Sequence, residues 1–75
     1  FNPITTISFA LPKESKVILE VYSINGRIIR KLVDNIMKPG YHSVIWNADS
    51  YSSGIYFIKM VAGEYTSTQK LILVK

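Results

Sequence analysis

The clearest structural signal in the chain lies in residues 17–33, which read VILEVYSINGRIIRKLV. Three aliphatic residues stand at alternate positions in its first part: Val17, Leu19 and Val21. This period of two predicts a β-strand with one buried face. The dipeptide Asn25-Gly26 follows, which accepts positive φ at both positions and is the strongest short hairpin signal. Because alternation resumes after it, the stretch predicts a β-hairpin with a primed two-residue turn or its glycine-bulge variant.

The same period of two runs through the rest of the chain. Strands are expected at residues 6–11, 17–22, 27–33, 41–46, 54–61 and 65–74. Segments such as Lys38-Pro39-Gly40 and Ala62-Gly63-Glu64 separate them and are typical of turns. No segment shows the helical period. Six short strands at roughly ten-residue spacing predict an all-β fold, a small antiparallel immunoglobulin-like β-sandwich of about six to seven strands.

Burial follows from this alternation, because each strand of a sandwich turns one face toward the opposite sheet. Seven side chains are expected to point inward: Val17, Leu19, Val21, Val44, Trp46, Tyr56 and Ile58. Phe9 and Phe57 are also assigned to the core, since a sandwich this small needs large residues inside. In residues 27–33, one face is expected to carry Ile28, Arg30 and Leu32, and the other Ile29, Lys31 and Val33.

Composition limits the kinds of protein this chain can be. With 75 residues it forms one domain at most. It has no cysteine, which excludes disulfides and thiolate metal sites, and a single histidine, His42, cannot form a multi-histidine site. No apolar run approaches the ~20 residues of a membrane span, and no signal peptide is visible. The net charge is +4, but only Arg27, Arg30 and Lys31 cluster, too few for a nucleic-acid-binding stripe.

Residues with catalytic potential do not converge in the sequence. The five acids are well separated along the chain: Glu14, Glu20, Asp34, Asp49 and Glu64. A carboxylate pair of the glycosidase type is therefore unsupported, and neither an enzymatic activity nor a cofactor is expected. Two weaker alternatives stay open. Asp49 and Asn47 could hold calcium, and Tyr51, in a polar loop, could offer an exposed ring for stacking on a sugar.

Six segments, read together, resemble one protein family. They are FNP (1–3), TTISFALP (5–12), VYSINGR (21–27), PGYHSVIWN (39–47), SGIYF (53–57) and KLILVK (70–75). In this order they resemble the type A C-terminal sorting domain of the bacterial type IX secretion system. The Ig-like module of flagellar hook-capping proteins is similar in the hairpin and the Pro-x-Gly strand, but the lysine-terminated end favours the sorting family. The Tyr-Pro-Asn-Pro that often precedes FNP in that family does not precede it in this sequence.

The resemblance implies a non-catalytic secretion signal. Residues 1–75 are accordingly expected to be a single Ig-like C-terminal sorting domain, at the end of a larger secreted protein. Such a domain directs its cargo through the type IX system, via the periplasm, to the cell surface or the medium. The expected partners are the outer-membrane translocon, the sortase that removes the domain, and the covalently attached upstream cargo. Neither nucleic acid nor a membrane span is expected.

Recognition by the translocon is expected where the resemblance is densest, at Gly54, Ile55 and Tyr56 and along the last strand with Lys70 and Lys75. An edge-pairing receptor could read this tail through backbone hydrogen bonds and alternate side chains. The two lysines could equally keep the apolar tail soluble. The alternative function is an Ig-like spacer or a carbohydrate-binding accessory module of a larger extracellular hydrolase, with Tyr51 as its sugar-stacking ring.

Overall fold

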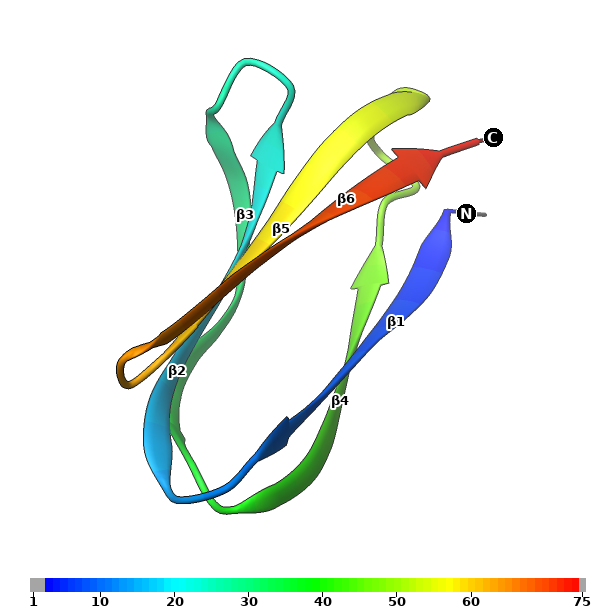
Figure 1. The fold of residues 1–75 in the computed structure, drawn as a ribbon. Coiled ribbons are helices and arrows are strands. Elements are labelled where there is room, and N and C mark those ends of the chain that lie inside the picture. Colours follow the sequence, from blue (N-terminus) through cyan, green and yellow to red (C-terminus); the bar gives the residue numbers. More distant parts are fainter. Residues whose placement is uncertain (1–2, 75) are drawn as a thin grey trace.

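The computed structural model describes residues 3–74, which form six antiparallel strands in two sheets. The strands are β1 (Ile4–Leu11), β2 (Ser15–Ser23), β3 (Ile28–Met37), β4 (Gly40–Asn47), β5 (Gly54–Ala62) and β6 (Tyr65–Leu73). β1 pairs with β4 in the smaller sheet, and the larger sheet has the order β3-β2-β5-β6. Figure 1 shows the start of β1 and the end of β6 at the same end of the molecule. The predicted all-β, two-sheet sandwich is confirmed.

The core lies between the two sheets and is centred on Trp46 of β4. Trp46 is 1% exposed and packs against Leu19 and Val21 of β2 and Ile58 of β5. The rings of Tyr51 and Tyr56 lie 5.8 and 5.6 Å from the Trp46 ring. Six of the seven side chains predicted to point inward are buried, and the seventh, Val44, is half-buried and packs against the same cluster. The period of two therefore predicted the core correctly.

The two phenylalanines assigned to the core have different outcomes. Phe9 is half-buried and packs against a second buried cluster at the other end of the sandwich, so its assignment is confirmed. The assignment of Phe57 was wrong. Its neighbours Tyr56 and Ile58 occupy the inner face of β5 and are buried. Because adjacent strand residues point to opposite faces, Phe57 lies on the outer face of the larger sheet.

The strict alternation predicted for residues 27–33 was also wrong. Two irregularities interrupt the pairing of β2 with β3, one between Leu19 and Glu20 and one between Val21 and Tyr22. Each inserts one extra residue into β3 and bends it, as β-bulges do. As a result, Leu32 from one predicted face and Ile29 and Val33 from the other all pack against the core. This strand also continues to Met37, four residues beyond its predicted end.

The β2–β3 hairpin adopts the glycine-bulge variant of the predicted turn. Gly26 has a φ of 82°, whereas no residue other than glycine in the described part of the chain has positive φ. The amide of Gly26 donates to the Ser23 carbonyl at 2.9 Å, and the amide of Ser23 donates to the Arg27 carbonyl at 2.8 Å. A type I turn followed by a left-handed glycine gives this pattern. The primed turn is excluded because it needs positive φ at Asn25 as well.

Candidate functional site

The sequence segments predicted to be recognised lie on two neighbouring strands. In the register of β5 with β6, Gly54 faces Leu73, Ile55 faces Ile72, and Tyr56 faces Leu71. One pair further along, Phe57 faces Lys70. The structure therefore brings Gly54, Ile55, Tyr56 and Lys70 together at one end of the larger sheet, near the start of β1 (Figure 1). Lys75 and the first two residues of the FNP motif, Phe1 and Asn2, lie outside the described residues.

β6 is an edge strand of the larger sheet. It pairs with β5 on one side, and no strand of residues 3–74 pairs with it on the other. Its side chains alternate between two environments. Leu71 and Leu73 point toward the core, where Leu71 is half-buried and Leu73 is buried. Lys70 and Ile72 point outward and are exposed. An edge strand of this kind can accept a further strand by backbone hydrogen bonding.

The residues of the predicted recognition segment differ in accessibility. Tyr56 is 8% exposed, and its hydroxyl donates to the Ser52 carbonyl at 2.6 Å, so its ring fixes the start of β5 from inside. Ile55 is half-buried on the opposite face, next to Ile72, which is 51% exposed. A partner approaching this end of the sheet would therefore contact Ile55, Lys70 and Ile72, with Tyr56 acting as support beneath them.

Tyr51, predicted to be an exposed ring, is half-buried. Its ring lies 5.8 Å from that of Trp46 and 6.2 Å from that of Tyr56, and its hydroxyl donates to the Ile29 carbonyl at 3.2 Å. The ring thus closes one end of the core. It also borders a shallow hollow of about 250 Å³ that is lined by polar residues of β3, the end of β4 and the β4–β5 loop: Arg30, Asn47, Asp49 and Ser50. At the start of this loop, the Asn47 side-chain oxygen accepts a hydrogen bond from the Asp49 amide at 3.0 Å.

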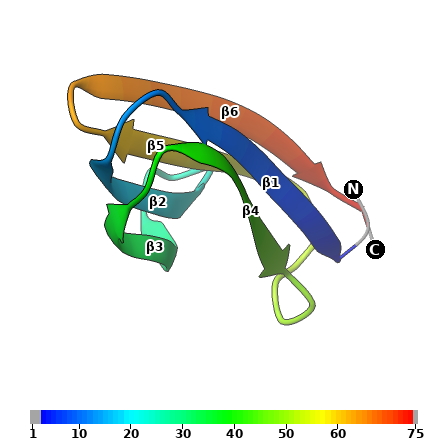
Figure 2. The ribbon, with the colours of Figure 1, turned by 90° about the horizontal axis from the view of Figure 1, so that it is seen from below.

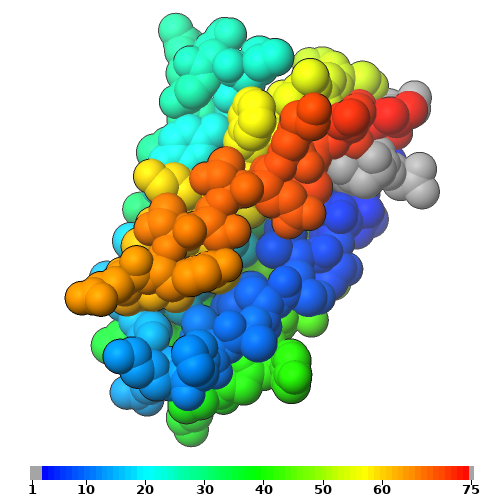
Figure 3. All heavy atoms as spheres, viewed as in Figure 1, coloured from blue at the N-terminus to red at the C-terminus, as the bar shows by residue number. Residues whose placement is uncertain are grey.

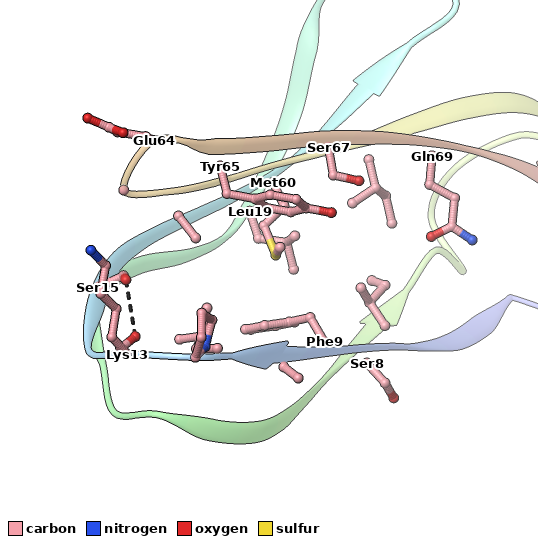
Figure 4. Close-up of a pocket in the computed structure, with 17 residues that line it drawn as sticks. Ser8, Phe9, Lys13, Ser15, Leu19, Met60, Glu64, Tyr65, Ser67 and Gln69 are labelled. Atoms are coloured by element: carbon pink, nitrogen blue, oxygen red, sulfur yellow. Dashed lines mark hydrogen bonds between the residues drawn. The ribbon is translucent and has the colours of Figure 1, made fainter.

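A larger groove of about 880 Å³ opens between β1 and β6, on the side where the two sheets are not joined. Figure 4 shows Ser67 and Gln69 pointing from β6 toward β1, with Phe9 on the opposite wall and Leu19 and Met60 between them. The floor is apolar and the β6 wall is polar. At the end of the groove, the Ser15 hydroxyl donates to the Lys13 carbonyl at 3.1 Å.

The ionisable groups are spread over the surface. Asp34 lies 3.5 Å from Lys16 and 3.4 Å from Lys31, and the hydrogen bond from Lys31 is the main reason that the pKa of Asp34 is lowered. Burial, and then the hydrogen bond to Glu20, raise the pKa of Tyr22. Residues 3–74 hold no group of three or more acidic or histidine side chains that could bind a metal ion, and no helix long and apolar enough to span a membrane.

The single histidine, His42, has a structural role beside the β3–β4 turn. Its ring stacks on Phe9 at 5.5 Å, and Nε2 lies 2.7 Å from the Lys38 carbonyl oxygen. These contacts hold the β3–β4 turn against the smaller sheet.

One surface feature escaped prediction from the sequence. Phe57 joins Ile55, Ile18 and Tyr22 on the outer face of the larger sheet, where all four are half-buried. The burial of Tyr56 and Ile58 was predicted, and the period of two then requires an outward Phe57. The signal was therefore present in the sequence, but the preference for large residues in the core was allowed to override it.

Comparison with known families assigns the whole chain. A family model described as the secretion system C-terminal sorting domain matches residues 1–75. No curated protein has a significant match to the chain. No solved structure matches it significantly either. The match spans the same residues as the six segments that resemble the type IX sorting domain.

Proposed function

The chain belongs to the secretion system C-terminal sorting domain family, and we propose that the type IX machinery recognises it at the β5–β6 end of the larger sheet. It is a sorting domain of type IX secretion cargo, a non-catalytic signal that interacts with the secretion machinery. Cargo of this system is secreted or displayed at the cell surface. The proposal concerns where on the fold the address lies.

One observation carries this proposal: two separate sequence segments lie side by side on neighbouring strands. The register places Ile55 beside Ile72, and Phe57 beside Lys70. β5 contains residues 54–57 of the segment SGIYF, and β6 contains residues 70–73 of the segment KLILVK. These are the two segments in which the resemblance to the sorting family is densest. A receptor can therefore contact both segments at once. Residues 58–69 separate them in the sequence, and the hairpin that joins β5 to β6 closes through the short turn at Gly63 and Glu64.

The position of β6 at the edge of the larger sheet offers a mechanism for this contact. A strand of the receptor added to β6 would gain affinity from backbone hydrogen bonds, which do not depend on sequence. Selectivity would come from the outward side chains at alternate positions, Lys70 and Ile72. Lys70 and Ile72 would offer the receptor a cation and an apolar side chain on the same side of the edge strand.

The identity of the partners extends this proposal. We assign the contact to the outer-membrane translocon, and the later removal of the domain to a surface sortase. In this scheme residues 1–75 form a single Ig-like domain at the end of a larger secreted protein, and the upstream cargo is carried with it. The domain itself supplies only the address, which agrees with the non-catalytic character of its family.

The test uses a periplasm-targeted reporter fused in front of residues 1–75, in a bacterium that has a type IX system. Replacing Lys70 and Lys75 by Ser should lower export by about tenfold, equivalent to ~1.4 kcal/mol of recognition free energy. The matched control has the same replacement by Ser at Lys13 and Lys38, two exposed lysines in turns remote from this surface. It should be exported normally. A second variant lacks residues 71–75 and should stay in the periplasm.

Thermal unfolding of each fusion separates folding from recognition. If the variant with Ser at positions 70 and 75 folds and is exported as well as the original domain, the lysines carry no address and only keep the tail soluble. The proposal then fails for these side chains.

A further inference from the structure

The larger sheet has one face that the rest of the described chain leaves uncovered. β1 and β4 lie on one side of this sheet only, as Figures 1 and 2 show. The opposite side, here called the outer face, is formed by alternate residues of the four strands. The cross-strand register places these residues on it: Ile28, Lys31, Asp34 and Ile36 of β3, Lys16, Ile18, Glu20 and Tyr22 of β2, Ile55, Phe57, Lys59 and Val61 of β5, and Thr66, Thr68, Lys70 and Ile72 of β6.

The outer face is unusually apolar for a solvated sheet. Its central strands present half-buried aliphatic and aromatic side chains, among them Ile18, Tyr22 and Phe57. At its margins Ile28 is 55% exposed and Ile36 is 66% exposed. An antiparallel sheet with one face in water normally alternates apolar inward and polar outward residues. A contiguous apolar patch that remains exposed marks an interaction surface.

Two lysines stand beside the aromatic centre of this face. Lys70 is directly opposite Phe57, and Tyr22 is opposite Phe57 on the other side. Lys59 is two residues further along β5, with Glu20 and Thr68 as its cross-strand neighbours. The centre of the outer face is therefore a pair of aromatic rings with a cation at one end and a second cation alongside.

The negative charges of the outer face are already engaged, whereas these two cations are not. Asp34 forms ion pairs with Lys16 and Lys31. Glu20 accepts a hydrogen bond from the Tyr22 hydroxyl at 3.0 Å. Within residues 3–74, neither Lys59 nor Lys70 forms an ion pair. The uncompensated charge on this face is positive, in a chain whose net charge is +4.

We propose that the outer face docks against an acidic protein surface of the secretion machinery, in which carboxylates meet Lys59 and Lys70 and apolar side chains cover Phe57. This inference rests on the proposed function and names the chemistry of the partner. Charge complementarity carries it. Two cations without an ion pair in residues 3–74 lie next to an apolar patch, and they match a partner surface that combines carboxylates with apolar side chains. Polar pairs at such a contact guide the approach, and the apolar centre holds the complex.

An anionic membrane is the competing partner for a basic and aromatic face. The position of Glu20 disfavours it, since this carboxylate lies between Lys31 and Lys59 in the register, in the middle of the face. A lipid surface of uniform negative charge would repel this carboxylate, whereas a protein can place donors opposite Glu20 and carboxylates opposite the two lysines.

The first test uses the reporter fusion with substitutions at Lys59, a residue outside the edge surface. Lys59→Glu should lower export by about tenfold, equivalent to ~1.4 kcal/mol, and Lys59→Gln should lower it less. The matched controls are Lys13→Glu and Lys13→Gln, which change the net charge equally in a turn off the outer face. Lys59→Gln also guards against misfolding, because Lys59→Glu places two carboxylates opposite each other at Glu20.

The outcomes separate this inference from the function on which it rests. If the unaltered fusion is not exported, the sorting function fails. The outer-face inference alone is overturned if the Lys59→Gln and Lys59→Glu fusions fold and are both exported as well as the unaltered fusion. Equal losses from Lys13→Glu and Lys59→Glu would also overturn it, because they would show an effect of net charge and not of this face.

A second test identifies the chemistry of the partner. A photo-crosslinking amino acid at position 68, next to Lys70 on the outer face, should give a crosslinked peptide rich in Asp and Glu. The same group at position 43, on the outer side of the smaller sheet, should give none. A crosslink at position 43 and none at position 68 would contradict the inference. Sedimentation of the fusion with vesicles of phosphatidylcholine and phosphatidylglycerol, lost in Lys59→Gln, would assign the face to a membrane and overturn the protein partner.

Discussion

At the scale of single residues, Gly26 closes the hairpin between β2 and β3 with a φ of 82°. A Cβ built at this position meets no heavy atom within 4 Å, so space is not what requires glycine. The requirement is conformational, because side chains branched at Cβ are strained at positive φ. Two backbone hydrogen bonds of Ser23 fix the chain in this conformation: its carbonyl accepts from the Gly26 amide, and its amide donates to the Arg27 carbonyl.

The first prediction follows from this conformational requirement. Gly26→Val should lower the free energy of unfolding by at least about 1 kcal/mol, measured by urea denaturation. Gly26→Asn is the matched control and should cost less, because asparagine tolerates the left-handed region. Equal stability of the Val variant and the original domain would contradict the glycine-bulge turn.

The second prediction concerns the acid at the centre of an ion-pair network. The hydrogen bond from Lys31, and then the charges of Lys16 and Lys31, hold the pKa of Asp34 below its ordinary value. Because the pKa is lower in the folded than in the unfolded chain, this carboxylate contributes stability above about pH 4. That contribution is lost as the pH falls through the lowered pKa. Since all three groups are exposed, the contribution to stability is small.

NMR titration of the Asp34 carboxyl carbon measures this directly. Lys31→Gln should raise the pKa of Asp34 toward its ordinary value, and Lys38→Gln, in the β3–β4 turn, should leave it unchanged. A pKa of Asp34 that does not respond to Lys31→Gln would show that this ion pair does not form in solution.

At the scale of the strands, local pattern predicted the elements well where each strand is regular. β2 and β5 follow the period of two without interruption along their shared register, so their inner faces could be predicted residue by residue. β3 could not, because its two bulges depend on how it pairs with β2, and pairing is not encoded in the alternation of one strand. The half-burial of Tyr51 has the same origin, since its hydroxyl meets Ile29, which is remote in sequence.

The candidate site was predictable only in part, for a related reason. The motif resemblance selected Gly54, Ile55, Tyr56 and Lys70, and the β5–β6 hairpin brings them together because its two-residue turn sets the register. The outer face was missed, because it is assembled from four strands. Seeing it requires the sheet order β3-β2-β5-β6, which strand prediction alone does not provide.

A third prediction tests the two faces of β2 with neighbouring residues. Leu19 is buried in the core, whereas Ile18 is half-buried on the outer face. Leu19→Ala should lower the free energy of unfolding by about 2–5 kcal/mol, since it leaves a cavity in the core. Ile18→Ala removes a side chain of the same size and should cost clearly less. Equal losses in urea denaturation would mean that the register of β2 is wrong.

At the scale of the whole molecule, the proposed recognition surface and the hydrophobic core use different parts of the larger sheet. Its inner face packs with the smaller sheet around Trp46 and makes the core of a domain that is too small to tolerate many losses. The outward side chains of its edge strand β6 and of its outer face are not part of that core. We therefore expect that substitutions in the proposed recognition surface can change export without unfolding the domain.

The measurement that tests sorting most directly is the location of a periplasm-targeted reporter fused in front of residues 1–75. In a bacterium with a type IX system, we predict that the reporter reaches the cell surface or the medium as efficiently as with a native sorting domain. The reporter alone, and the fusion in a strain without the translocon, should remain in the periplasm. If the fusion stays in the periplasm while a native sorting domain exports the same reporter, the account is contradicted and the spacer or carbohydrate-binding alternative takes its place.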